Sequence, residues 1–470
     1  MIRWWRGCAL LGAALSTTAP GGAAHAAVHE VPPGAPIAPF LRRAVAGDTV
    51  QLGPGEYFEQ LLLDKTVILR GAADGSTRLR GGYVGNVILV TAAGTVVEGL
   101  EVSEAKVALG QDMACIRIEA DDVVVRNTRI TRPLHGIYVK GGNRARIIAN
   151  RIEGREDLIE SDRGNGIHLW NSTGNELRGN EISGTRDGIY FSFANETLCQ
   201  ENIVREVRYG LHYMYSDDNT FEDNLFVHNV AGAALMYSKG IIFRRNVFAH
   251  CRGFRAYGIL FQSMDGSSAV DNLIFDNSRG VFLSNSDHNE LRNNDVVSND
   301  LALQLNGSCD DNVIADNNFV QNLSSLLVDA GGSTTRWTHH GRGNHWSNYR
   351  GFDSDGDGLG ERPHAIQNIF QLMEADTPQV RFYLLSPAAV ILEAAEQALP
   401  ILDLGEEEDP RPQVQRVANP AVPWSRLAGQ RRAGSPLAAC IYLLILAAGA
   451  FAWWRGVLGG TRARHTGARP

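Results

Sequence analysis

Two consecutive stretches decide the fold: residues 188–209 read GIYFSFANETLCQENIVREVRY and residues 210–231 read GLHYMYSDDNTFEDNLFVHNVA. Each stretch begins with a glycine followed by alternating apolar residues, and each carries an asparagine fourteen residues after that glycine. Such a short period, without helical spacing, is typical of a solenoid built from short strands. We therefore expect one coil of strands for every twenty-two residues.

The same unit extends in both directions along the chain. The offset of fourteen residues recurs in seven repeats, which are Gly136/Asn150, Gly166/Asn180, Gly188/Asn202, Gly210/Asn224, Gly232/Asn246, Gly258/Asn272 and Gly280/Asn294. About eight extra residues follow the first of these asparagines, around 154–162, and four follow the fifth, near 251–255. Both insertions fall in the same connection, which predicts one corner of each coil that tolerates loops.

These features predict an all-β fold, a right-handed parallel β-helix whose coils stack about 4.8 Å apart. The recurring asparagines can then form an amide ladder at an inner corner. In each Gly-Ile-x-Leu segment, the period of two directs Ile and Leu inward and the residues between them outward. A leucine-rich repeat is disfavoured, because its Leu-x-x-Leu-x-Leu frame is absent from the sequence.

The β-helix is expected over residues 47–335. Open ends of a solenoid expose unpaired strand edges and need covers. Residues 28–46 are therefore predicted to form an N-terminal helical cap, and residues 336–412, where the period breaks, a loop-rich C-terminal cap with a helix at 387–399. Residues 413–436 are rich in Pro and Arg and are predicted to be a linker.

Apolar stretches lie near both ends of the chain. Residues 1–27 combine two arginines, an apolar run and an Ala-His-Ala cleavage site, which predicts a signal peptide for export. Residues 437–458 form a second apolar stretch that ends in a tryptophan pair, and residues 459–470 form a basic tail. This pattern predicts a C-terminal hydrophobic helix that spans the membrane, or a sorting segment that is cleaved.

Composition narrows the class of partner. The net charge of −8 argues against an extended nucleic-acid surface, which would need clustered Lys and Arg. Beyond the signal peptide the chain has five cysteines and no Cys-x-x-Cys motif, so we expect most of them to be small buried hydrophobes.

With the coils placed, several segments resemble one family, the nitrous-oxide-reductase maturation proteins called NosD. The resemblance lies in NRIEGR (150–155), GNGIHLWN (164–171), RYGLHYMYS (208–216) and GNHWSNYRGFDSDGDGLG (343–360). It spans roughly residues 28–412, and these motifs are longer than a generic β-helix match. Two features depart from the family pattern: His345 stands where Tyr is expected, and the C-terminal apolar segment is unfamiliar.

The resemblance implies a periplasmic accessory protein rather than an enzyme. Its implied partners are an ABC permease and ATPase, nitrous oxide reductase, whose copper–sulfide centre such complexes help to assemble, and a copper chaperone. The family is described as copper-binding, so copper is the implied ligand.

Columns read down the repeat identify candidate copper ligands. His212 and Met214 share a strand, and Met236 follows one coil later, about 4.8 Å away. One imidazole and two thioethers suit Cu(I), a soft ion. The alternative is that the methionines contact a partner protein.

A second group of outward residues is aromatic: Tyr138, His168, Trp170 and Tyr190. A face this apolar is predicted to be covered, either by another segment of the chain or by a docked partner. A further column contains His228 and His250 between carboxylates, which favours an ion-paired corner over a metal site.

A calcium-like turn is predicted at Asp353, Asp355 and Asp357, where alternating carboxylates are followed by glycines that permit a sharp turn. The twelfth position is His364 instead of Glu, so the loop is no EF-hand. A solvated turn without calcium is the alternative.

Two other functions remain open at this stage. Parallel β-helices also host polysaccharide lyases and epimerases, but we find no obvious set of catalytic carboxylates. A scaffold that docks the reductase without touching metal is the other alternative.

Overall fold

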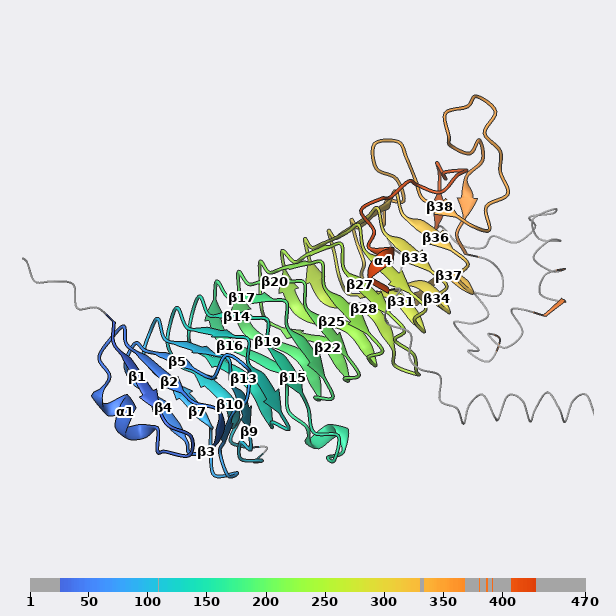
Figure 1. Cartoon of the computed structure of the whole chain (residues 1–470). Coiled ribbons are helices and arrows are strands. Elements are labelled where there is room, and N and C mark those ends of the chain that lie inside the picture. The colour runs from blue at the N-terminus through green and yellow to red at the C-terminus, as the bar shows by residue number, and fades with distance from the viewer. Residues whose placement is uncertain are drawn as a thin grey trace, which may run out of the picture.

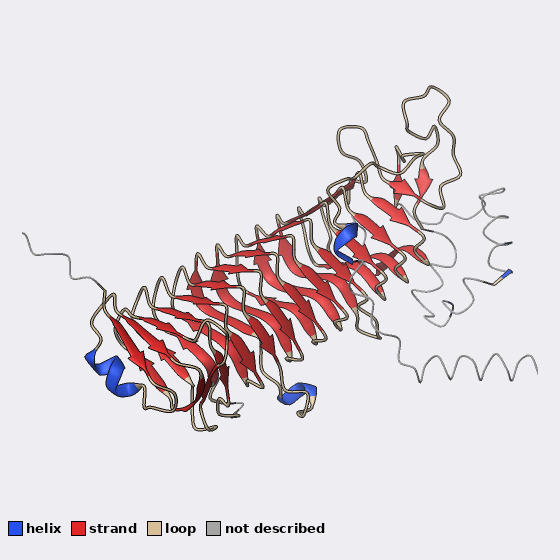
Figure 2. Cartoon of the chain, viewed as in Figure 1, coloured by secondary structure: helices blue, strands red, loops and turns tan. Residues whose placement is uncertain are grey.

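The chain winds into an elongated stack of coils built from three parallel β-sheets (Figure 1). The computed structural model describes residues 26–108, 110–329, 334–367 and 407–427, with four isolated positions between 380 and 391. Within these ranges the three sheets hold 13, 12 and 13 strands, and hydrogen-bonded neighbours come from successive coils. Figure 2 shows that strands dominate the solenoid and that helices are few and short. The predicted parallel β-helix is confirmed.

We name the sheets A, B and C. Sheet A begins with β1, which pairs with β2 and so starts the stack at the N-terminal end. Its strands are β1 (Val28–Val31), β2 (Thr49–Leu52), β5 (Ile68–Arg70), β8 (Val96–Glu98), β11 (Val124–Arg126), β14 (Arg146–Ile148), β17 (Glu176–Arg178), β20 (Leu198–Gln200), β23 (Thr220–Glu222), β26 (Ile242–Arg244), β29 (Ser268–Val270), β32 (Glu290–Arg292) and β35 (Val313–Ala315).

Sheet B follows sheet A within each coil. Its strands are β3 (Gly55–Phe58), β6 (Thr77–Arg80), β9 (Glu101–Ser103), β12 (Arg129–Thr131), β15 (Arg151–Glu153), β18 (Glu181–Ser183), β21 (Ile203–Arg205), β24 (Leu225–Val227), β27 (Val247–Ala249), β30 (Leu273–Phe275), β33 (Asp295–Val297), β36 (Asn318–Val320) and β38 (His345–Trp346).

Sheet C contains the longest strands of the solenoid, up to nine residues. Its strands are β4 (Leu61–Leu63), β7 (Ile88–Val90), β10 (Ala114–Ile118), β13 (His135–Lys140), β16 (Ile167–Thr173), β19 (Asp187–Asn195), β22 (Tyr209–Met214), β25 (Ala231–Lys239), β28 (Tyr257–Asp265), β31 (Arg279–Ser284), β34 (Leu301–Asn306) and β37 (Ser324–Asp329).

The register of sheet C is the one that the repeat predicts. Ile189 pairs with Leu211, and Tyr190 pairs with His212, one coil further along. The repeated glycine is needed because the coils approach closely there. A Cβ atom on Gly188 would lie 2.7 Å from the carbonyl oxygen of Gly210 and 2.2 Å from a methyl group of Val204.

The predicted asparagine ladder runs through the core at the corner between sheets A and B. Eight side-chain amide bonds of 2.9 to 3.1 Å join nine asparagines, which are Asn150, Asn180, Asn202, Asn224, Asn246, Asn272, Asn294, Asn317 and Asn344. Each rung also satisfies backbone groups: Asn224 Nδ2 donates to the carbonyl of Cys199, and the backbone N–H of Asn202 donates to Asn224 Oδ1. The ladder therefore holds neighbouring coils in register.

Apolar side chains fill the interior between the three sheets. Phe191 and Tyr213 stack at 5.0 Å between ring centroids, and Phe226 and Phe248 at 5.2 Å, so like residues lie on like. The four cysteines of the solenoid, Cys115, Cys199, Cys251 and Cys309, are buried thiols, as expected.

The connections from sheet B to sheet C carry the insertions. The segment between β15 and β16 contains the 3₁₀-helix η1 (Glu160–Asp162), and a shorter loop separates β27 from β28. The β9–β10 connection, residues 104–113, is also longer than the usual connection from sheet B to sheet C. These three loops lie at the corner between sheets B and C, where the repeat predicted them, but the β5–β6 connection, residues 71–76, is also longer than its counterparts and lies between sheets A and B.

A short helix closes the N-terminal end, as predicted. Helix α1 (Ala38–Arg43) is preceded by Ile37, which is fully buried, and Phe40 and Leu41 pack against the core of the first coils. The loop-rich cap at the other end includes the antiparallel pair β39 (His364–Ala365) and β40 (Glu408–Asp409). Asp409 there accepts hydrogen bonds from the Asn344 backbone at 2.7 Å and the Trp346 indole at 2.9 Å.

Residues 413–427 do not form the linker that we predicted. They run back along sheet B and end in α4 (Trp424–Leu427), where the Trp424 indole donates to Asp295 at 2.6 Å and contacts Phe275. Val422 is buried against apolar residues of β24, β27 and β30. The Pro-rich composition did not indicate this packing, because only a few side chains, such as Val422 and Trp424, make the contacts with sheet B.

Several predicted segments fall outside the described ranges. These are residues 1–25 of the signal peptide, most of the helix at 387–399, residues 428–436, the hydrophobic helix at 437–458 and the basic tail at 459–470. In the part of the chain that the structure describes, no helix has the length and apolar character needed to cross a membrane.

The ladder gives a first prediction. Asn224→Ala removes four hydrogen bonds from a fully buried site, so we expect the free energy of unfolding to fall by about 3 kcal/mol or more. Urea denaturation followed by circular dichroism measures this change. In the matched control, Asn195→Ala at an exposed position, the loss should stay below about 1 kcal/mol. Equal losses in the two variants would contradict the structural role of the ladder.

Candidate functional site

The outer face of sheet C carries the candidate residues. Tyr138, His168, Tyr190 and His212 form one column, in which neighbouring ring centroids lie 4.4, 4.6 and 4.8 Å apart. The predicted column is therefore a continuous row of rings in contact, stacked between Tyr138 and His168 and edge-to-face in the other two pairs. Trp170 lies beside it, 38% exposed, with the Lys140 ammonium 5.6 Å from its ring centroid.

Two of these side chains are not exposed, although they point out of the sheet. Tyr138 is 3% exposed and His168 is 9% exposed. The inserted B–C loops rise beside this part of the sheet, and burial raises the pKa of Tyr138 to about 12. The alternative that the chain covers its own aromatic face thus holds at this end, whereas Trp170 remains open to a partner.

A cavity of about 550 Å³ lies between the inserted loop and the sheet. The loop contributes Ser161, Arg163, Gly164 and Asn165, whereas Asp112 and His135 come from neighbouring segments. Its floor consists of Tyr138, His168 and Tyr190 from the aromatic column, together with Lys140, Trp170 and Arg186. Sequence reasoning missed Arg163, Asn165 and Arg186, because only the folded loop brings them over sheet C.

His212 is held by a carboxylate that we did not predict. The buried Asp187 lies 3.0 Å from His212 Nδ1 and accepts bonds from Arg208 at 2.7 and 2.9 Å. Arg186 donates to the same carboxylate at 3.3 Å. The signal for Asp187 was its place directly before Gly188, where the strand enters sheet C.

This ionic cluster sets the charge of Asp187. Burial alone would raise its pKa, but hydrogen bonds and charges from His212 and Arg208 outweigh burial and lower the pKa to about 2. Asp187 is therefore an anion at neutral pH and orients the imidazole of His212 through Nδ1. The other ring nitrogen, Nε2, remains the one able to bind a metal.

The two candidate methionines lie where the repeat placed them. Met214 pairs with Met236 in the next strand, and His212 pairs with the small Ala234. Both methionines are half-buried, and the Tyr190 hydroxyl approaches Met214 Sδ at 3.9 Å. One imidazole and two thioethers thus share a small area of sheet C.

Three exposed aromatic rings next to the methionines were not predicted. Phe193, Tyr215 and Tyr237 stack at 5.4 and 5.3 Å between centroids, five residues after their glycines. Each has a positive φ, of 51°, 49° and 56°, a conformation that costs energy for bulky residues. This ladder extends the apolar surface beyond the candidate copper ligands.

The histidines at the corner behave as predicted. His228 and His250 stack at 4.8 Å between centroids, and His250 Nδ1 lies 2.7 Å from Asp276. Arg252 pairs with the same carboxylate at 2.5 Å. The corner is thus linked by ion pairs.

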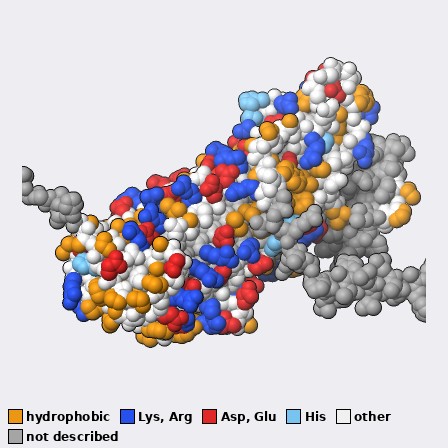
Figure 3. Space-filling view, viewed as in Figure 1, with side chains coloured by type: hydrophobic (Ala, Val, Ile, Leu, Met, Phe, Trp, Pro, Cys, Tyr) orange, Lys and Arg blue, Asp and Glu red, His pale blue; other side chains and the backbone are white. Residues whose placement is uncertain are grey.

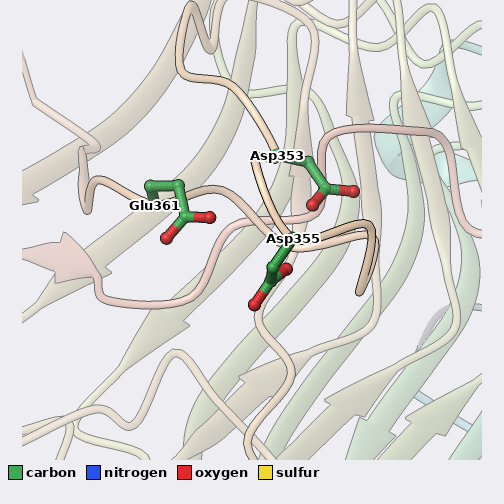
Figure 4. A group of neighbouring side chains, drawn as sticks. All are labelled: Asp353, Asp355 and Glu361. Carbon is green, nitrogen blue, oxygen red and sulfur yellow. The ribbon is translucent and has the colours of Figure 1, made fainter.

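The calcium-like turn differs from the predicted ligand set (Figure 4). Asp353 and Asp355 converge with Glu361, and one oxygen of each lies within 4.8 Å of the others. Asp357 instead pairs with Arg411 at 3.0 Å. Backbone N–H groups of the turn already bond to Asp353 and Asp355, so calcium gains no support.

The Asp187 cluster gives a second prediction. The lowered pKa means that the stabilisation from Asp187 is fully present above about pH 4 and is lost as the pH falls through about 2. Asp187→Asn removes a fully buried anion that Arg208 and His212 both contact, and should cost about 3 kcal/mol at pH 7. Urea denaturation at several pH values should show this cost shrinking below pH 4. The control Asp223→Asn removes a carboxylate that is 28% exposed and pairs with Arg245, so it should cost less than about 1 kcal/mol. A pH-independent cost for Asp187→Asn would contradict the assignment.

Comparisons with known proteins agree with the resemblance seen in the motifs. Residues 148–351 match the model of a family described as "Periplasmic copper-binding protein (NosD)". Two relatives bear the name "Probable ABC transporter binding protein NosD". The one from Stutzerimonas stutzeri is 31% identical over 383 residues, which cover 77% of this chain and 86% of the relative. The one from Pseudomonas aeruginosa is 32% identical over 383 residues, which cover 78% and 88%.

Solved structures resemble the chain more distantly. The catalytic domain of a GH87 α-1,3-glucanase gives a TM-score of 0.44 at 13% identity, covering 66% of this chain and 69% of that one. The periplasmic alginate epimerase AlgG gives a TM-score of 0.39 at 13% identity, covering 62% and 75%. These scores are too low to transfer an activity. The similarity to the two relatives over most of their length is decisive instead, and this chain belongs to the NosD family.

Proposed function

We propose that this chain is a periplasmic, copper-binding accessory protein that works with an ABC transporter in the maturation of nitrous oxide reductase. The family description and the names of the relatives support a binding protein associated with transport. The ABC permease and ATPase, the reductase and a copper chaperone are the partners that follow from this proposal. The signal peptide at residues 1–27 would direct export.

One observation carries the copper proposal: Asp187 orients His212 beside two methionines. A carboxylate at Nδ1 fixes the tautomer of an imidazole and increases its basicity as a ligand through Nε2. Met214 and Met236, which are register partners in β22 and β25, add thioether sulfur. Soft sulfur ligands with one imidazole select Cu(I) over hard cations.

The surroundings of the three ligands suit transient binding. Met214 and Met236 are only half-buried, so a partner can reach the ion. Phe193, Tyr215 and Tyr237 expose an apolar surface next to the sulfurs. We propose that the partner that gives or receives copper docks on this ladder and on Trp170.

This proposal assigns no catalysis to the chain. The alternative of a polysaccharide lyase or epimerase needs a base and acids around a substrate groove, whereas the titratable groups beside His212 are engaged with Asp187. A metal-free scaffold remains the competing function, and the copper experiment separates it from ours.

Copper titration gives a third prediction. The full chain should bind one Cu(I) at this site in competition with a Cu(I) chelator. The double variant Met214→Leu/Met236→Leu, and separately His212→Gln, should weaken binding about tenfold or more, because each removes ligands while preserving side-chain size. X-ray absorption should report sulfur and nitrogen neighbours around the ion.

The controls use residues of the same types elsewhere. Met113→Leu lies in the β9–β10 connection, four strands away along sheet C, and His250→Gln lies at the ion-paired corner. Neither should change the affinity for Cu(I). Unchanged affinity in the double variant would remove this copper site and favour the scaffold.

A further inference from the structure

The cavity beside the inserted loop is separate from the candidate copper ligands. Its volume of about 550 Å³ falls in the range of small-molecule sites. Neither Met214 nor Met236 lines it, and His168 in its floor is two coils from His212. Any ligand of this cavity is therefore recognised by other residues.

Hydrogen bonds around Asn165 fix the proton of His168. The buried Asn165 accepts a bond from Arg186 at its Oδ1, 3.2 Å away, so its amide nitrogen faces His168 Nδ1 at 3.5 Å. That nitrogen donates, which leaves the His168 proton on Nε2. In the described part of the chain, Nε2 is a buried atom with no hydrogen-bond partner.

His168 stays neutral, so this donor is permanent near pH 7. Burial, followed by the neighbouring His135, lowers the pKa of His168 to about 3. His135 accepts a bond from the Asn165 backbone at Nδ1, 3.0 Å away, and therefore faces Asp112 with its other nitrogen at 3.8 Å. The floor thus offers a donor that the protein itself does not use.

The charges that line the cavity are mainly positive. Lys140, Arg163 and Arg186 oppose the single carboxylate Asp112, which is already near His135. Arg163 directs three of its five N–H groups to the backbone carbonyls of Leu158, Gly184 and Glu156, so it contributes mainly charge to the cavity. The Lys140 ammonium contacts only the Trp170 ring in the interactions of the described residues, and it remains available to a ligand.

We propose that this cavity binds a small anionic ligand through its oxyanion or carboxylate oxygens. Lys140 and the His168 Nε2–H are its hydrogen-bond donors, Arg163 and Arg186 attract its charge, and Trp170 covers its carbon skeleton. The positive lining disfavours a metal cation here. The inserted residues 154–165 then serve as the wall of a binding site, which explains why this coil carries the longest insertion among the seven repeats. The inference does not rest on copper binding.

Isothermal titration of the full chain with citrate and with sulfate, against chloride at equal ionic strength, tests the proposal. We expect saturable binding of at least one of the two probes. Stronger binding of citrate would identify the ligand class as an organic carboxylate. Equal or stronger binding of sulfate would identify it as an inorganic oxyanion. Binding of neither probe above chloride would overturn the proposal.

Matched variants locate the binding. Lys140→Met should weaken anion binding about fivefold or more, as expected for the loss of a charge-assisted hydrogen bond. The control Lys239→Met, at the exposed end of β25, should leave anion binding unchanged. His168→Phe preserves the ring stack but removes the donor, and His288→Phe is its exposed control. Because Lys140 is not part of the core, its variant remains informative even if His168→Phe fails to fold. Equal anion affinity in the wild type and in Lys140→Met would overturn the assignment. It would also be overturned if His168→Phe lost affinity for copper but kept its affinity for the anion.

Discussion

The whole structure depends on one constraint, which is that each coil must stack in register on the next. The backbone N–H and C=O groups of the parallel strands form hydrogen bonds only with the coils above and below. At the corner between sheets A and B, the asparagine side chains likewise form hydrogen bonds from one coil to the next. A buried amide without its partner costs more than an exposed one, so the ladder tolerates little change. The repeated glycine of sheet C follows from the same constraint, because the adjacent carbonyl leaves no room for a side chain.

Register also decides where function can develop. Strands cannot lengthen without displacing the stack, whereas the connection from sheet B to sheet C can, and the two longest loops between the described coils, residues 104–113 and 154–166, occur there. These loops turn part of a flat sheet into a walled cavity. Basic and acidic side chains are interspersed on the face of the solenoid that Figure 3 shows, and ion pairs such as Arg244–Glu222 and Arg245–Asp223 join them. Sheet C instead exposes the aromatic side chains of Trp170, Phe193, Tyr215 and Tyr237.

The copper candidates and the anion cavity occupy neighbouring parts of this one face. The Tyr190 ring lies between them: it touches His168 on one side and His212 on the other. Asp187 and Arg186 connect the two regions as well, since Arg186 bonds both to Asp187 and to Asn165 beneath the cavity. A ligand in the cavity and an ion at His212 would therefore act on the same small network of charges.

Much of the site could be foreseen from periodicity. Residues twenty-two apart became neighbours, so the pairing of Met214 with Met236 followed from counting. The burial of Tyr138 and His168 did not follow, since it depends on loops whose path carries no period. Asp187 was missed as well, because its place before Gly188 does not reveal that the folded strands bring Arg208 and His212 to its carboxylate.

The sequence by itself determined the solenoid, its inward and outward faces and the tolerant corner, because these depend on local spacing that every coil repeats. Only the tertiary structure decided which outward residues are covered, which carboxylate holds His212, and that residues 413–427 pack on sheet B. Those contacts join segments far apart in the chain through single side chains. No repeat encodes them, so they become visible only when the coils and loops are placed together.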